Sequence, residues 1–272
     1  WKIVNIYSRR EREVSMSVDL ERVGGVGVIS LNAPPANAYN LEMLQEFQSI
    51  IQNIRQDSDI RVVVIQSSIE KFFCAGADIS MIKDTDSTGF RNFITVAGET
   101  MAMLEETPKV IIAAIAGHAM GGGLELALAC DLRFGMDSDY KLGLVEINLG
   151  LNPAMGGTQR LPRLIGRSKS IRMITTGETI SPELAFTWGI FDWLEDKKDF
   201  DSKVMQYAEK LAEGPTVAQG FAKQSIIKGL EMSLAEGTAL ERSNQQILMA
   251  TDDAGEGLDA FLSKRQPKFK GS

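Results

Sequence analysis

The middle of the chain reads Gly121-Gly122-Gly123-Leu124-Glu125 and continues as the apolar run 126–130, which favours a helix. Glycine lets the backbone approach a ligand without interference from a Cβ atom. The first N–H groups of a helix lack intrahelical partners and carry partial positive charge. We therefore expect this turn to stabilise a developing oxyanion, by about 3 kcal/mol for each well-placed donor. A turn that merely permits tight helix–strand packing is the structural alternative.

A second glycine-bearing turn, Phe73-Cys74-Ala75-Gly76-Ala77-Asp78, precedes the first. The β-branched runs 61–66 and 110–116 predict strands buried on both faces, and each leads into one of the two turns. Because α/β enzymes build their sites at strand ends, both turns are expected at one site. There the Ala77 N–H can point at the same oxygen, and Asp78 is expected to form a turn or cap.

The remaining pattern divides the chain into three parts. A strand is predicted at 26–31 and a helix at 41–54 with Asn40 as its N-cap, so we assign residues 17–199 to an α/β core. Residues 1–16 are interpreted as an N-terminal extension. Residues 200–272 have the pattern of successive helices, which suits a subunit interface or a lid. The helices are predicted at 202–213, 216–229, 233–250 and 255–265.

Two glutamates stand in apolar surroundings that point to buried acids. Glu125 lies among Met120, Leu124 and Leu126, and Glu146 lies within the apolar segment 142–149. A buried carboxyl must be protonated or partnered, and its pKa tends to rise. Taken alone, each glutamate is equally compatible with a structural and a catalytic role. Together with the glycine turns they predict acid–base chemistry next to a carbonyl.

The scarce residues exclude several classes of enzyme. The sequence holds one histidine, His118, and two cysteines, Cys74 and Cys130. A zinc site built from several His and Cys ligands is therefore not expected. A Ser-His-Asp triad lacks a G-x-S-x-G elbow, and a hydrogen-bonded structural histidine is the favoured reading of His118. Both cysteines are expected to be reduced and inert.

Charge and hydropathy narrow the partners. The net charge of −7 disfavours nucleic acid, which requires a basic face. No apolar run approaches the roughly 20 residues of a membrane span, and no signal-peptide stretch opens the chain, so we expect a cytoplasmic protein. A paired-carboxylate glycosidase is disfavoured by an aromatic content of 7%, which leaves little for a sugar-stacking cleft.

With these motifs in order, residues 17–269 resemble the enoyl-CoA hydratase/isomerase (crotonase) family. The order and spacing of the matching segments carry the resemblance more than any single one does. The segments are Pro35-Ala36-Asn37-Ala38, residues 73–78, residues 116–127, Glu146 through Pro153, Gly156-Gly157-Thr158-Gln159-Arg160-Leu161, and residues 261–267.

The resemblance implies an α/β fold, a spiral of ββα turns with a C-terminal helical trimerisation region, and trimers that often pair into hexamers. In the family's pattern the N–H groups of Ala77 and Gly122 form the oxyanion hole for an acyl-CoA thioester. The substrate's CoA would contact the segment Ala75–Ile79, including Asp78, and Lys71, while Lys264 would reach a neighbouring subunit's CoA. No separate cofactor or metal is implied, since CoA is part of the substrate.

Members with both glutamates resemble hydratases. The implied reaction adds water to a trans-2-enoyl-CoA, with Glu125 activating water and Glu146 handling the Cα proton. Isomerisation of the double bond, or hydration of a cyclic or dienoyl thioester, is the alternative on the same scaffold. A non-catalytic RNA-binding relative is disfavoured by the acidic balance and the intact pair of acids. In a eukaryote the location would be the mitochondrial matrix.

The sequence departs from the family's usual pattern at three places. Ala154-Met155 stands where hydratases often carry Gly-Ala, which affects the acyl end of the pocket. Ser80 replaces a common lysine and removes a phosphate contact. The segment 131–146 is one residue longer than expected, so the alignment of Glu146 depends on residues 156–160.

Overall fold

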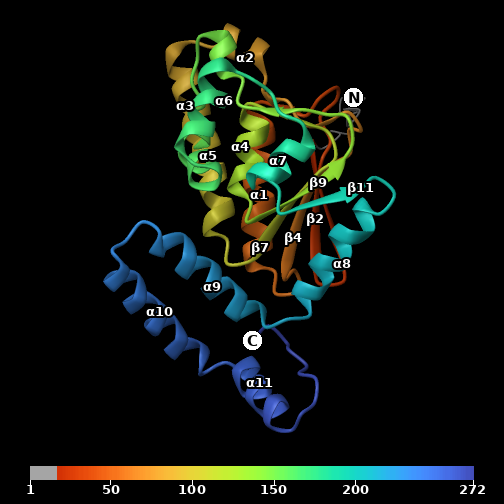
Figure 1. Ribbon diagram of the computed structural model, residues 1–272, viewed down its shortest axis with the longest axis vertical. Coiled ribbons are helices and arrows are strands. Elements are labelled where there is room, and N and C mark those ends of the chain that lie inside the picture. The colour runs from red at the N-terminus through yellow and green to blue at the C-terminus, as the bar shows by residue number, and fades with distance from the viewer. Residues whose placement is uncertain (1–16) are drawn as a thin grey trace, which may run out of the picture.

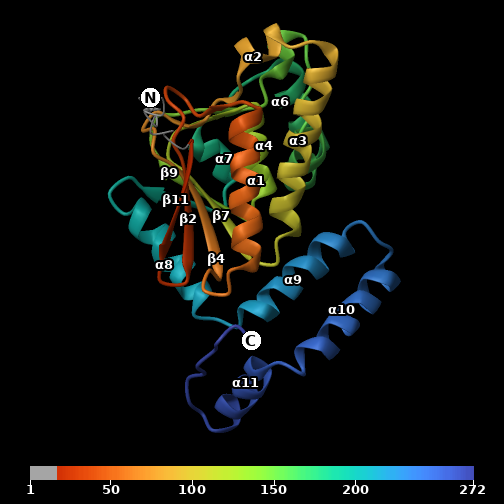
Figure 2. The ribbon, with the colours of Figure 1, turned by 180° about the vertical axis from the view of Figure 1, so that it is seen from behind.

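The computed structural model describes residues 17–272, and the predicted extension 1–16 lies outside them. Figure 1 shows a sheet with helices packed against it and a group of C-terminal helices that projects from this core. The view from behind in Figure 2 shows the same separation. The expected α/β class is confirmed.

The main sheet of the described residues has six strands in the order β1-β2-β4-β7-β9-β11. Strands β1 and β2 are antiparallel, and every later neighbour is parallel. The predicted strands at 26–31, 61–66 and 110–116 appear as β2, β4 and β7, and β4 and β7 are buried on both faces as expected. The bounds are β1 Val18–Val23, β2 Val26–Leu31, β4 Val62–Ser67, β7 Val110–Ile115, β9 Leu132–Asp137 and β11 Trp193–Asp196.

Short strands form two further small sheets that carry the chain toward the site. One has the order β10-β8-β5, and the other pairs β3 with β6. Strand β5 follows β4, β8 follows β7 and β10 follows β9, and a helix comes after each short strand or its continuation, which gives the expected spiral of ββα turns. The bounds are β3 Ala38–Tyr39, β5 Phe72–Cys74, β6 Gly76–Ala77, β8 His118–Met120 and β10 Leu142–Gly143.

Helices cover both faces of the main sheet. Alternate side chains of β4 and β7 point to opposite sides, where Val63 and Ile65 join a large core with α1, α3 and α4, and Val62 and Val64 join a smaller one with α8. The Asn40 side chain caps α1 as predicted, because its Oδ1 accepts from the Met43 N–H at 2.9 Å. The bounds are α1 Leu41–Gln56, α2 Ile79–Asp84, α3 Ser87–Glu106, α4 Gly122–Ala129, the 3-10 helix η1 Glu146–Leu149, α5 Gly157–Ile165, α6 Arg167–Thr176, α7 Pro182–Trp188 and α8 Phe200–Ala212.

The last three helices are α9 Thr216–Gly229, α10 Leu234–Leu248 and α11 Asp252–Leu262. They follow the predicted helical run closely. A buried lysine ties α9 to the core, because Lys223 Nζ lies 2.8 Å from Asp131 Oδ2 and donates to the Leu104 carbonyl at 2.9 Å. Large apolar side chains of these helices stay exposed, and Phe261 is 83% exposed. None of the helices in residues 17–272 combines the length and apolar character needed to cross a bilayer.

Candidate active site

The glycine turn at the start of α4 is held tightly by its neighbours. Gly121 has φ 51°, which favours glycine, and its N–H donates to the Gly143 carbonyl of β10 at 2.7 Å. A Cβ atom on Gly123 would lie 2.1 Å from the Cys74 carbonyl oxygen, so only glycine permits this approach. Within residues 17–272 no protein acceptor pairs with the Gly122 N–H. That N–H is therefore free to meet a ligand oxygen.

The second glycine turn meets the first, as the sequence predicts. Gly76 has φ 93°, and a Cβ atom built on it would lie 3.0 Å from the Gly122 nitrogen. Ala77 follows at once and is partly buried. Asp78 is a cap, as expected, because its Oδ1 accepts from the Ser80 N–H at 2.8 Å at the start of α2. The N–H groups of Ala77 and Gly122 thus come from adjoining turns, and their joint role as an oxyanion hole stays a prediction.

Glu125 is completely buried in the first turn of α4. Its Oε1 accepts from the N–H groups of Met155 at 2.8 Å and Gly157 at 2.7 Å. Its Oε2 is buried with no partner among the described residues. Burial raises the pKa of this carboxyl, and the two backbone hydrogen bonds oppose that rise by favouring the charged form. One oxygen is fixed, and the other is available for water.

Glu146 opens η1 beside the glycine turn. A Cβ atom on Gly121 would lie 3.0 Å from Glu146 Oε1. Both carboxyl oxygens are buried, and the structure of residues 17–272 offers neither a hydrogen-bond partner. Burial raises the pKa of Glu146 to about 7, and the nearby charge of Glu125 adds to the rise. The two acids therefore share one site, and about half of the Glu146 carboxyls are protonated at pH 7.

Met155, which the sequence placed at the acyl end of the pocket, and Tyr39, which it did not assign to the site, close the site on one side. Tyr39 Oη lies 3.1 Å from Met155 Sδ, and both side chains are buried. Burial is the main cause that raises the Tyr39 pKa well above its usual value, so the phenol stays protonated. The anomalous Ala154-Met155 pair was a signal for Met155. Tyr39 gave no such signal, because nothing local relates it to a residue more than a hundred positions away.

An arginine network supports the segment that holds Glu125. Arg160 on α5 makes a bidentate ion pair with Glu105 on α3, with Nε–Oε1 at 2.8 Å and Nη2–Oε2 at 2.6 Å. Its Nη1 donates to the Met155 carbonyl at 2.6 Å. Arg160 therefore fixes the segment 155–157, in which the N–H groups of Met155 and Gly157 bind Glu125. Its charge also opposes the rise of the Glu125 pKa.

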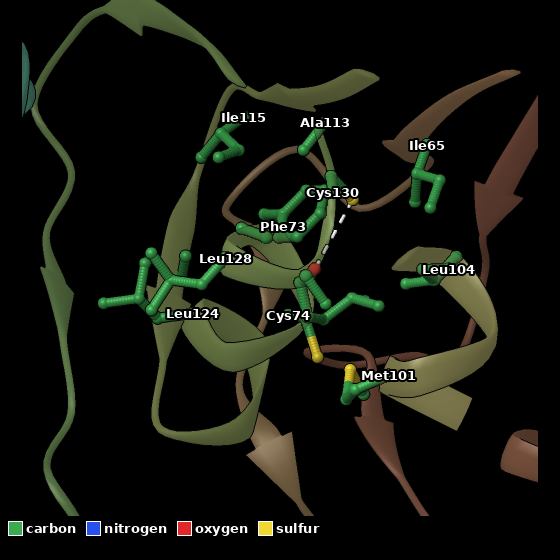
Figure 3. Close-up of a cluster of buried hydrophobic side chains, with 14 of the residues drawn as sticks. Ile65, Phe73, Cys74, Met101, Leu104, Ala113, Ile115, Leu124, Leu128 and Cys130 are labelled. Atoms are coloured by element: carbon green, nitrogen blue, oxygen red, sulfur yellow. Dashed lines mark hydrogen bonds between the residues drawn. The ribbon is translucent and has the colours of Figure 1, made fainter. Parts of the chain in front are cut away.

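The histidine and the cysteines have structural surroundings. His118 Nδ1 accepts from the Lys141 N–H at 3.0 Å. Cys74 donates to the Asn37 carbonyl at 3.0 Å, and Figure 3 shows Cys74 and Cys130 among the apolar side chains of the core. Burial raises the pKa of both thiols to about 12. Neither is a nucleophile at neutral pH.

The predicted CoA contacts lie in two separate places. Lys71, Ala75 and Ile79 belong to the segment around β5, β6 and α2, where Lys71 and Ile79 are exposed. Lys264 follows α11, and α11 lies at the opposite end of the molecule from α2 in both views (Figures 1 and 2). Within one chain, α11 is therefore separated from α2, the helix that Ile79 begins. Within residues 17–272, no group of three or more His, Cys, Asp or Glu side chains gathers in a way that could hold a metal ion.

Known proteins are similar to this chain over most of its length. A family model described as enoyl-CoA hydratase/isomerase matches residues 21–272. A crystal structure of an enoyl-CoA hydratase from Geobacillus kaustophilus HTA426 superposes with a TM-score of 0.92 at 41% identity, covering 94% of this chain and 97% of that one. An enoyl-CoA hydratase structure from Bacillus anthracis gives 0.90 at 37% identity, covering 94% and 100%. The short-chain-enoyl-CoA hydratase of Clostridium acetobutylicum is 33% identical, over 92% of this chain and 96% of its own length.

Proposed function

This chain belongs to the enoyl-CoA hydratase/isomerase family, and from that premise we propose that it adds water across the 2,3 double bond of an enoyl-CoA thioester. The observation that supports this proposal most directly is that the two carboxyls, whose oxygens are covered, differ in their hydrogen-bond partners. Glu125 has one oxygen fixed by two N–H donors, whereas Glu146 has no partner among the described residues and a pKa of about 7. One acid suits a base, and the other suits a proton donor.

The proposed reaction assigns one step to each group. Glu125 Oε2 takes a proton from water while the water oxygen bonds to Cβ of the substrate. The π electrons of the double bond move toward the thioester, whose oxygen accepts from the N–H groups of Ala77 and Gly122. Protonated Glu146 then gives its proton to Cα, and exchange with solvent restores both carboxyls. The product is a 3-hydroxyacyl-CoA, and the reaction is reversible.

The substrate's CoA is proposed to contact Lys71 and the segment Ala75–Ile79, including Asp78. Since α11, which Lys264 follows, lies at the opposite end of the molecule from α2, Lys264 is proposed to contact the CoA of a neighbouring subunit. The exposed apolar side chains of α9–α11 support self-association. We propose a homotrimer or a dimer of trimers, as the family resemblance implies. No cofactor besides the substrate's own CoA is proposed. The division at residue 199, the role of residues 1–16 and the location in cytoplasm or mitochondrial matrix stay predictions.

The test is turnover of crotonyl-CoA, followed by loss of its conjugated absorbance, in the wild type and in Glu125→Gln and Glu146→Gln. We expect rapid turnover in the wild type and a fall of about 100- to 10,000-fold in kcat for each variant, the range for losing a general acid or base. Equilibrium binding of CoA should persist in both variants. A wild type that neither turns over an enoyl-CoA nor binds CoA would overturn the proposal.

Isomerisation of the double bond is the second candidate, because moving a proton strictly requires one acid. The unpartnered, protonated carboxyl of Glu146 is compatible with that role. Under this alternative, Glu125→Gln would spare activity on a 3-enoyl-CoA and would abolish hydration only. Cyclic and dienoyl thioesters are tested in the same assay.

A further inference from the structure

We propose that the Met155 side chain, held by the Tyr39 hydroxyl, ends the acyl site and restricts this chain to short, crotonyl-sized enoyl thioesters. The proposal rests on the proposed function, since it describes the substrate of that same site. It assigns a specificity role to two residues from distant parts of the sequence, one in β3 and one in the segment before α5.

Met155 reaches from the Glu125 carboxyl to the turn at Gly122. Its N–H donates to Glu125 Oε1 at 2.8 Å, so its backbone lies at the acid proposed to activate water. Its methyl carbon reaches the other side, where a Cβ atom on Gly122 would lie 2.5 Å from Met155 Cε. The Cα and Cβ of a substrate must lie between Glu125, Glu146 and Gly122. The next carbons of the acyl chain therefore meet the Met155 side chain.

Tyr39 keeps this methionine in place. Methionine is flexible and by itself would yield to a longer acyl chain. Here Met155 is only 7% exposed, and its sulfur accepts from Tyr39 Oη at 3.1 Å. The Tyr39 ring is 3% exposed and stacks on Phe93 of α3, with 6.2 Å between ring centroids. A displaced Met155 would have to break these contacts inside a close-packed core.

The space beyond Tyr39 does not relieve this restriction. It is a cavity of about 20 Å³, lined by apolar side chains from β2, α1, α3 and α4, by Cys74 of β5 and by Tyr39 itself. Such a volume holds about one water-sized group. The buried Met155 side chain occupies room that a longer acyl group would use. One surplus methylene in a hydrophobic pocket costs about 10- to 200-fold in kcat/KM.

The experiment compares kcat/KM for crotonyl-CoA, trans-2-hexenoyl-CoA and trans-2-octenoyl-CoA in the wild type and three variants. We expect the wild type to favour crotonyl-CoA over octenoyl-CoA by at least about tenfold. Met155→Ala should raise the octenoyl-to-crotonyl ratio by about tenfold or more. Tyr39→Phe, which keeps the ring and loses the hydroxyl, should raise it less. Met173→Ala removes a fully buried methionine from α6 and should leave the ratio unchanged.

Equilibrium binding separates this proposal from the proposed reaction. Butyryl-CoA and octanoyl-CoA have no double bond to hydrate, so their affinities report on the acyl site alone. We expect Met155→Ala to tighten octanoyl-CoA binding relative to butyryl-CoA by a similar factor. If no enoyl-CoA is turned over but this shift occurs, the hydratase proposal fails and the specificity proposal stands. Equal use of all chain lengths by the wild type, a ratio unmoved in Met155→Ala, or no binding of either thioester would overturn it.

Discussion

The ionised Glu146 carboxyl destabilises the folded state at high pH, because its oxygens are buried without partners in the described structure. Its folded pKa of about 7 lies above the value of about 4.3 for an unfolded chain. The folded state therefore binds the proton more tightly, and stability is lost as pH rises from about 4.3 through about 7. We expect Glu146→Gln to escape this loss and to exceed the wild type by about 1–3 kcal/mol in free energy of unfolding at pH 8.

Urea unfolding at pH 5 and pH 8 checks this prediction. The advantage of Glu146→Gln should be small at pH 5 and larger at pH 8. Glu183→Gln is a useful control, because the hydrogen bond from Ser181 lowers the pKa of that exposed carboxyl rather than raising it. A Glu146→Gln advantage that is the same at both pH values would contradict the buried, protonated carboxyl.

The same ionisation predicts the pH profile of the reaction. A proton donor with a pKa of about 7 loses its proton as pH rises, so hydration of crotonyl-CoA should decline above about pH 7. The limbs of the profile belong to the coupled pair of glutamates rather than to one residue. Steady-state rates between pH 5 and pH 9 provide the measurement. A rate that keeps rising through pH 9 would show that protonated Glu146 is not needed.

At the scale of residues, the sequence singled out the two glutamates but did not predict the contact of Tyr39 with Met155 beside them. Apolar neighbours in the chain correctly indicated that Glu125 is buried. Glu146 is half-buried beside exposed Ile147 and Leu149, and its carboxyl oxygens are covered by tertiary contact with the turn at Gly121. The contact of Tyr39 with Met155 joins distant segments, and only the tertiary structure shows it.

At the scale of elements, the ion pair between Arg160 and Glu105 joins α5 to α3 and positions the segment that binds Glu125. Lysine keeps the charge but lacks the planar fork that makes three directed hydrogen bonds. We expect Arg160→Lys to lower kcat on crotonyl-CoA by about 10- to 100-fold through displacement of Glu125, with KM much less affected. Arg163→Lys, on the exposed side of the same helix, is the matched control.

A purely structural role of Arg160 would give a different result. Arg160→Gln also removes a charge that lowers the Glu125 pKa, so the acid limb of its pH profile should move to higher pH than in Arg160→Lys. If both variants only lower the thermal unfolding midpoint, and kcat of the folded fraction is unchanged, Arg160 does not position Glu125.

The helix at 41–54, the C-terminal helices and the buried strands were predictable because hydrophobic periodicity and capping are local, whereas α2, α3, α5, α6 and α7 were not predicted. Thr216–Gly229 was predicted with both ends correct, since Gly214-Pro215 stops the preceding helix and the pattern restarts after it. The short strands β3, β6 and β10 were not predicted from local pattern. Each has two residues, and it exists only because a partner from elsewhere in the chain supplies its hydrogen bonds.

At the scale of the whole molecule, the order of strands follows from long-range pairing that no local pattern encodes. The resemblance to a family supplied the spiral, and the observed pairing of β4 with β7 and of β5 with β8 agrees with it. Helix α8 packs on the sheet, so the helices that project from the core begin with α9. The apolar surface of the projecting helices has no cover within the described chain.

That uncovered surface predicts self-association. Leu258 and Phe261 on α11 are strongly exposed, and such side chains in a folded chain indicate an interface. We expect light scattering after size exclusion to give three times 29.8 kDa, about 89 kDa, or twice that value. The double variant Leu258→Glu with Phe261→Glu should shift the protein toward monomer, because it places charges in the contact. Leu20→Glu on the edge strand β1 serves as the control and should leave the assembly intact.

Oligomeric state and CoA affinity should then change together, since Lys264 follows α11, which lies at the opposite end of the molecule from α2. If the neighbouring subunit supplies Lys264, the monomeric double variant should bind CoA more weakly, and Lys264→Ala should weaken CoA binding in an intact oligomer. Calorimetric titration with CoA measures both. A wild type that is monomeric at micromolar concentration, yet binds CoA through Lys264, would show that α11 must move toward its own core.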